Sequence, residues 1–206
     1  MSPAEQLGRC RVLPVMTVRD IDATVQLAQA LARGGMRAVE ITLRTPAALE
    51  CLGAVKAAVP DMLVAAGTVT NAELLDKATV AGADFCVSPG LTPALMRASI
   101  ENSICLLPGV ATASEVMLGL EHGLTLFKLF PAVAVGGIEL LKSLAGPFPD
   151  VRFCPTGGLN AANFQEFLAL PNVICCGGSW MVSADLVDNG KWEAIEALAR
   201  AAMTDV

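Results

Sequence analysis

Lys128 is the residue in this chain whose surroundings best suit a nucleophile. It lies late in the apolar segment Leu124–Phe130, where strand alternation puts Leu126, Lys128 and Phe130 on one face. In a helix-covered barrel neither face of such a strand is solvated, so the ammonium must be paired or neutralised. A neutral amine attacks ketones and aldehydes, although a structural ion pair would explain the same placement. The other lysines lie in predicted helices or a turn, where solvation explains them: Lys56, Lys77, Lys142 and Lys191.

A carboxylate, a hydroxyl and a guanidinium share one face of the segment Ala38–Arg44. Strand alternation separates Glu40, Thr42 and Arg44 from the apolar residues between them. The apolar set is expected to face helices, so the polar set faces the interior and its mouth. Glu40 can shuttle protons there, and Arg44 can hold a carboxylate with its planar guanidinium. The alternative is a structural bridge from Glu40 to Lys128 or to Arg44.

Two glycine-rich segments suggest an anion site. Pro155-Thr156-Gly157-Gly158 ends one apolar run, and Gly177-Gly178-Ser179 ends the next. Without side chains in the way, backbone amides at such turns can approach a phosphate closely. A single Gly-Gly pair often marks only a tight turn. Two of them at successive strand ends favour a phosphorylated substrate.

A repeated pattern of strands and helices would position these residues. Short β-rich apolar runs recur about every 20 to 27 residues, a spacing typical of strand-plus-helix units. The eight runs are Val12–Val18, Ala38–Leu43, Leu63–Val69, Asp84–Ser88, Ile104–Val110, Leu124–Phe130, Val151–Thr156 and Val173–Gly177. Helix-spaced apolar residues lie between the runs, and the predicted N-caps of these helices are Asp20, Thr45, Asn71, Thr92 and Thr112.

Eight such units predict an α/β fold: a single parallel (β/α)8 TIM barrel with a short N-terminal helix, forming one domain over residues 1–206. In that fold the active residues lie at the carboxyl ends of the strands, and the loops after strands seven and eight bind phosphate. An open doubly wound sheet is the second possibility. It is disfavoured because no G-x-G-x-x-G follows the first strand.

Composition narrows the function. The chain has 206 residues, 14 basic and 20 acidic side chains, and a formal charge of −6, which argues against nucleic acid and anionic membranes as partners. One histidine, His122, excludes multi-histidine metal sites, and we expect no metal and no cofactor. The polar start of the chain, Met1–Arg11, does not resemble a secretory signal.

The seven cysteines are odd in number and follow no metal-binding spacing. Most lie inside apolar runs, where free cysteine behaves as a small hydrophobic residue. We therefore expect reduced core thiols in a cytosolic protein. The positions are Cys10, Cys51, Cys86, Cys105, Cys154, Cys175 and Cys176.

Eight short motifs are distributed along the chain. They are Glu40-Ile-Thr-Leu-Arg-Thr45, Gly67-Thr-Val69, Ser88-Pro-Gly90, Leu107-Pro-Gly109, Phe127-Lys-Leu-Phe-Pro-Ala132, Ala145-Gly-Pro-Phe148, Arg152-Phe-Cys-Pro-Thr-Gly-Gly158 and Gly177-Gly-Ser-Trp180. Taken together, these motifs resemble those of the 2-keto-3-deoxy-6-phosphogluconate (KDPG) and 4-hydroxy-2-oxoglutarate (KHG) aldolase family of class I enzymes. The similarity runs from about Val12 to the C-terminus. One difference follows Pro131-Ala132, where Val133-Ala134-Val135 replaces the polar residues typical of the family.

The resemblance implies roles for individual residues. Lys128 would be the Schiff-base lysine and Glu40 the proton shuttle. The residues implied to surround the pyruvyl end of the substrate are Arg44, Thr68, Pro89 and Thr156, and Phe130 is implied to be a further substrate-binding residue. The residues implied to hold the phosphate are Gly157, Gly158, Gly177, Gly178 and Ser179.

The resemblance also implies an activity and its setting. The enzyme would be a carbon–carbon lyase of the Entner–Doudoroff pathway that cleaves KDPG to pyruvate and glyceraldehyde 3-phosphate, and also acts on KHG. It would be a cytoplasmic homotrimer whose partners are small molecules, namely a phosphorylated 2-keto-3-deoxy sugar acid and pyruvate. The alternatives are the sister aldolase for the galactonate-derived substrate, a phosphosugar epimerase or isomerase, and a non-catalytic phosphosugar-binding barrel.

Overall fold

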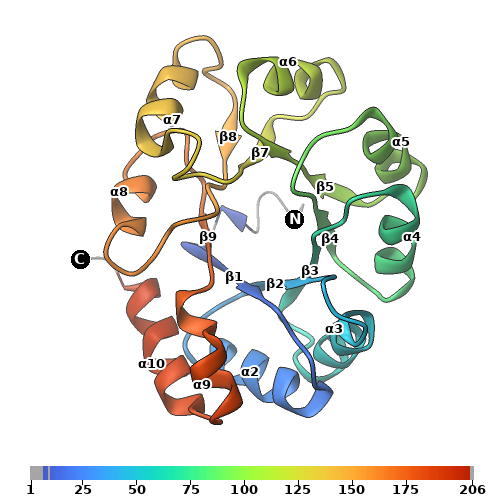
Figure 1. The fold of residues 1–206 in the computed structure, drawn as a ribbon, viewed down its shortest axis with the longest axis vertical. Coiled ribbons are helices and arrows are strands. Elements are labelled where there is room, and N and C mark those ends of the chain that lie inside the picture. The colour runs from blue at the N-terminus through green and yellow to red at the C-terminus, as the bar shows by residue number, and fades with distance from the viewer. Residues whose placement is uncertain (1–6, 9, 205–206) are drawn as a thin grey trace.

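The computed structural model describes residues 7, 8 and 10–204. Figure 1 shows the strands grouped around the centre of the molecule and the helices outside them. The short helix predicted at the N-terminus falls mainly outside the described residues. No helix among those that are described is long and apolar enough to cross a membrane.

The strands form two parallel sheets. The six-stranded sheet has the order β5-β4-β3-β2-β1-β9, and the three-stranded sheet has the order β6-β7-β8. The first sheet contains β1 (Val12–Met16), β2 (Ala38–Thr42), β3 (Leu63–Gly67), β4 (Phe85–Val87), β5 (Cys105–Leu107) and β9 (Cys176–Gly178). The second contains β6 (Gly109–Val110), β7 (Leu126–Leu129) and β8 (Arg152–Phe153).

The predicted single closed eight-stranded barrel is therefore wrong, and two prolines explain the breaks between the sheets. Pro108 has no N–H to donate, and it divides the predicted run Ile104–Val110 into β5, which pairs with β4, and β6, which pairs with β7. Pro155 interrupts the strand after β8, so only isolated bridges, Phe153 to Val173 and Thr156 to Gly177, connect this region to the β9 side.

The helices follow the predicted spacing. They are α2 (Ile21–Arg33), α3 (Ala48–Ala58), α4 (Ala72–Val80), α5 (Pro93–Glu101), α6 (Ala113–Glu121), α7 (Gly137–Ala145), α8 (Phe164–Leu168), the 3-10 turn η1 (Trp180–Val182), α9 (Ala184–Asp188) and α10 (Trp192–Met203). Side chains cap four of them as predicted: Asp20, Asn71, Thr92 and Thr112. Thr45 is not a cap, because α3 starts later and the Thr45 hydroxyl donates to the Val18 carbonyl at 2.6 Å.

Strand alternation divides the core into two apolar clusters. Val39 and Ile41 belong to the large cluster that includes helix residues such as Leu31 and Leu52. Ala38, two residues before Glu40, belongs to a smaller cluster with Phe85. The predicted division of β2 into a helix-packed apolar face and a second face is thus confirmed. All of the cysteines except Cys105 are buried, which confirms the prediction that most of them are core residues.

Candidate active site

A buried ion pair joins β7 to β2. The Nζ of Lys128 lies 3.1 Å and 3.2 Å from the two carboxylate oxygens of Glu40. The two side chains are 7% and 2% exposed, so water hardly reaches either charge. The backbone N–H of Lys128 donates to the Pro108 carbonyl at 2.8 Å and fixes its place on the strand. Of the two bridges that the sequence left open for Glu40, the structure shows the one to Lys128.

Gly67, at the end of β3, leaves the space that Glu40 occupies. A Cβ at this position would collide with the Glu40 carboxylate. β3 is the direct neighbour of β2, with Gly67 in register with Thr42. A glycine here is thus required for the close approach of the carboxylate rather than for an unusual backbone angle.

Arg44 is held at the mouth and not in a bridge to Glu40. Its Nε donates to the Thr68 hydroxyl at 2.9 Å. Thr68 has a φ of 61°, in the left-handed region that a β-branched residue seldom adopts. Such strain is typical of functional sites, where the surrounding structure enforces it. Among the described residues the only ion-pair partner of Glu40 is Lys128, so the predicted alternative bridge to Arg44 is absent.

A pocket of about 170 Å³ opens onto Lys128. Most of the predicted site residues line it: Arg44, Lys128, Phe130, Thr156, Gly157, Gly158, Gly177, Gly178 and Ser179. The ring of Phe130 has its centroid 5.3 Å from the Lys128 Nζ, close enough for a cation–π contact. Glu40, Thr68 and Pro89 are not in the lining. Val15 and Leu159 line the pocket and were not predicted.

One wall of the pocket is suited to an anion. Gly157 and Gly158 have φ angles of 101° and 84°, which only glycine adopts without strain. Within the described part of the chain, the backbone N–H groups of Gly157, Gly158 and Ser179 donate to no protein acceptor. These amides are therefore available to a ligand.

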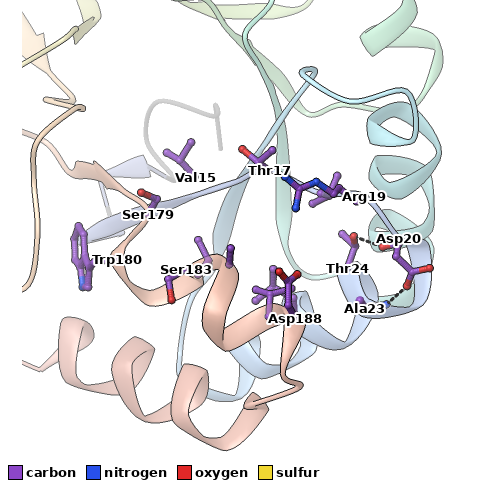
Figure 2. A pocket seen from close by; sticks show the side chains of 15 residues that line it. Val15, Thr17, Arg19, Asp20, Ala23, Thr24, Ser179, Trp180, Ser183 and Asp188 are labelled. Carbon is purple, nitrogen blue, oxygen red and sulfur yellow. Dashed lines mark hydrogen bonds between the residues drawn. The ribbon is translucent and has the colours of Figure 1, made fainter.

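A larger hollow of about 460 Å³ adjoins this pocket and shares Val15 and Ser179 with it. Figure 2 shows Arg19 on the opposite side of this hollow from Ser179 and Trp180. Arg19 has no ion-pair partner among the residues described. Asp188 also lines the hollow, so its charges are mixed.

Two buried thiols contact each other near the ion pair, and one of them, Cys154, lies within electrostatic reach of Lys128 and Glu40. Cys175 donates to the Cys154 sulfur at an Sγ–Sγ distance of 3.4 Å. This hydrogen bond holds the pKa of Cys154 below its usual range, and the charge of Lys128 acts in the same direction. The same bond, together with full burial, raises the pKa of Cys175 well above its usual range. Across the described residues no grouping of three or more His, Cys, Asp or Glu side chains could hold a metal ion.

The parallel α/β fold and the lysine–carboxylate pair beside free backbone amides define a site of the kind that class I aldolases use. Comparison with known proteins identifies the family. The sequence model of the family described as KDPG and KHG aldolase matches residues 4–198 of this chain. The chain belongs to this family.

Individual relatives support the assignment to this family. The chain is 48% identical over 192 residues to the KHG/KDPG aldolase of Escherichia coli, covering 93% of this chain and 90% of the relative. The KDPG aldolase of Legionella pneumophila, solved with pyruvate captured as a covalent carbinolamine intermediate, superposes with a TM-score of 0.95 at 43% identity and covers 98% of both chains. The KDPG aldolase of Zymomonas mobilis, solved with 3-phosphoglycerate, has a TM-score of 0.92 at 45% identity, covering 98% of this chain and 95% of that one.

Proposed function

We propose that Lys128 is the Schiff-base lysine of this chain and that Glu40 shuttles its protons. The chain is a class I aldolase, a carbon–carbon lyase that cleaves KDPG to pyruvate and glyceraldehyde 3-phosphate. The observation that carries the assignment of residues is the buried Lys128–Glu40 pair, whose nitrogen opens into a pocket with free backbone amides.

The first half of the reaction forms the imine. Proton transfer from Lys128 to Glu40 along the 3.1 Å hydrogen bond leaves a neutral amine. This amine attacks the C2 ketone of the substrate and gives a carbinolamine. Glu40 then returns the proton to the C2 hydroxyl, which leaves as water and produces the iminium.

The second half breaks the carbon–carbon bond. Glu40 takes the proton of the C4 hydroxyl, the C3–C4 bond breaks, and its electrons flow to the iminium nitrogen. Glyceraldehyde 3-phosphate leaves, and the remaining pyruvate enamine is protonated at C3. Water then hydrolyses the iminium to release pyruvate and regenerate Lys128. The iminium is the electron sink for the carbon–carbon cleavage.

The two ends of the substrate meet different groups. Arg44, hydrogen-bonded to Thr68, receives the 2-keto carboxylate with its planar guanidinium. The resemblance adds Pro89 and Thr156 at this end, and Phe130 as a further substrate-binding residue. The backbone at Gly157-Gly158 and Gly177-Gly178, with the Ser179 hydroxyl, receives the phosphate.

A second hollow adjoins the pocket at Lys128 on the side of Ser179. The pocket at Lys128 holds about 170 Å³, below the roughly 300–1,000 Å³ usual for ligand pockets. The adjoining hollow of about 460 Å³ begins at Ser179 and gives the aldehyde half more room.

We also infer the setting from the family resemblance. The chain acts as one domain over residues 1–206, as a cytoplasmic homotrimer in the Entner–Doudoroff pathway, with KHG as a second substrate. Sedimentation velocity tests the assembly, because a trimer of this chain and a monomer differ threefold in mass. Cleavage assays on KDPG, on KHG and on the galactonate-derived epimer rank the substrates.

Borohydride trapping tests the residue assignment. Incubation with pyruvate and borohydride should add one reduced pyruvyl group, and peptide mass spectrometry should place it on Lys128. Lys128→Ala should abolish both the adduct and KDPG cleavage. The matched control is Lys142→Ala, which removes an exposed lysine paired with Glu139 and should change neither. An adduct on any other lysine would refute the assignment.

A further inference from the structure

Three successive carbonyl groups of the glycine loop are tied down by hydrogen bonds from outside the pocket. Two of the donors are backbone N–H groups in the segment that follows β7, and the third is a side-chain amide. The bonds run from Ala132 N–H to the Thr156 carbonyl at 2.8 Å, from Val133 N–H to the Gly157 carbonyl at 3.1 Å, and from Asn163 Nδ2 to the Gly158 carbonyl at 3.2 Å.

These bonds determine where the following amides point. In a planar trans peptide the C=O of one residue and the N–H of the next point to opposite sides of the C–N bond that joins them. The only cis bond in the described chain is Phe130-Pro131, so the loop peptides are trans. Each fixed carbonyl therefore directs the N–H of the next residue, Gly157, Gly158 or Leu159, away from the group that donates to that carbonyl.

The three residues that carry these amides border the same space. Gly157, Gly158 and Leu159 all line the pocket that opens onto Lys128. Within the described residues none of their N–H groups donates to a protein acceptor. Three adjacent free donors match the three terminal oxygens of a phosphate monoester dianion, and hydrogen bonds to such a charged acceptor are stronger than neutral ones.

Asn163 is the one side chain among the three ties. Its Nδ2 donates to the Gly158 carbonyl, while its Oδ1 accepts from the Asn160 N–H at 2.8 Å. A side chain with both a donor and an acceptor is needed to bridge these two backbone groups. Without it, the Gly158–Leu159 peptide has no bond that fixes its orientation.

We infer that Asn163 is a positioning residue for phosphate recognition and that the Leu159 N–H is a third backbone donor to the phosphate. The inference deepens the proposed function and rests on it. Asn163 itself touches no reacting atom. It holds the Gly158–Leu159 peptide so that the amide is already directed at the anion, which lowers the ordering cost of binding.

The test compares Asn163→Ala and Asn163→Ser with Asn160→Ala. The control removes a bond in the same turn, from Ala162 N–H to the Asn160 side chain at 2.8 Å, and leaves the Gly158 carbonyl tied. The readouts are kcat and KM for KDPG, cleavage of 4-hydroxy-2-oxobutanoate, which carries no distal anion, and pyruvate trapping. Inorganic phosphate is the ligand probe, measured as the rise in Tm that it produces.

Both Asn163 variants should raise KM for KDPG about tenfold, equal to about 1.4 kcal/mol, and weaken phosphate binding to a similar degree. Trapping and 4-hydroxy-2-oxobutanoate cleavage should stay near wild type, and Asn160→Ala should behave as wild type throughout. Equal losses on both substrates, or an unchanged KM and phosphate response in the Asn163 variants, would overturn the inference. If the wild type traps no pyruvate, the proposed function fails instead, and the Tm response to phosphate still decides the role of Asn163.

Discussion

The buried pair of Lys128 and Glu40 makes opposite predictions for stability and for catalysis. A structural salt bridge would be present because it stabilises the fold, whereas a catalytic pair can persist despite its cost. Replacing each residue by methionine, singly and together, distinguishes the two explanations. Methionine is unbranched and flexible, so it can follow the path of either side chain in the core.

The expected energies follow from burial. Both side chains are at most 7% exposed and each is the ion-pair partner of the other, so either single substitution leaves an unpaired charge in the interior. Removing one partner of a buried pair costs about 3–5 kcal/mol, while replacing both by apolar groups of similar volume is close to neutral. For a chain of 206 residues, each single variant should lose about 6–20 °C in Tm, and the double variant should recover most of that loss.

Urea denaturation at pH 7 and one fixed protein concentration measures the free energy of unfolding of the wild type, the two single variants and the double variant. KDPG cleavage is assayed on the same samples. All three variants should be inactive, although the double variant should be nearly as stable as the wild type. A double variant less stable than either single one would show that the pair stabilises the fold by more than apolar packing can replace. Turnover by Lys128→Met would refute the catalytic assignment outright.

Three further predictions concern the substrate ends, the seat of Glu40 and the thiols. Ser179→Ala should lower kcat/KM for KDPG by the equivalent of about 0.5–3 kcal/mol and leave kcat/KM for KHG nearly unchanged. Arg44→Ala should lower kcat/KM for both substrates. Equal losses on both substrates from Ser179→Ala would show that this hydroxyl does not bind the phosphate. Gly67→Ala should lower kcat for KDPG at least tenfold, because the new Cβ displaces the Glu40 carboxylate from the lysine; wild-type turnover would disprove that dependence. Burial raises the pKa of Cys86 to about 12, so the folded state favours the protonated thiol and stability should fall as pH rises from about 9 towards 12, by about 1.4 kcal/mol per unit for this group. Cys86→Ala should flatten that slope in alkaline urea titrations, and an unchanged slope would contradict the assignment.

Strand positions were predictable because each buried strand is an apolar run bounded by polar or glycine residues. Ala38–Leu43 and Leu63–Val69 differ from β2 and β3 by at most two residues at one end. The closure of the sheet was not predictable in the same way. It depends on which backbone N–H groups remain free to pair, and Pro108 and Pro155 remove donors where the eight-stranded ladder would continue.

Some residues of the site were predictable from the sequence and others were not. Lys128 and Glu40 stood out because charged residues inside apolar strands are rare, and period-two alternation located both. Val15 gave no signal, since a valine in a strand looks like any core residue. Leu159 contributes its backbone, and Asn163 acts through a hydrogen bond that depends on how the loop turns in space. Neither contribution is visible in residue type or spacing.

The ties around the glycine loop also connect the two halves of the proposed chemistry. β7 carries Lys128, and the chain leaving that strand supplies the N–H groups of Ala132 and Val133 that hold the Thr156 and Gly157 carbonyls. One continuous segment therefore positions both the proposed nucleophile and the wall proposed to receive the phosphate. Because hydrogen bonds of 2.8 Å and 3.1 Å hold that wall in place, the spacing between the imine carbon and the phosphate is set by the protein. A substrate whose phosphate sits one carbon nearer or farther can satisfy the lysine or the amides, but not both at once.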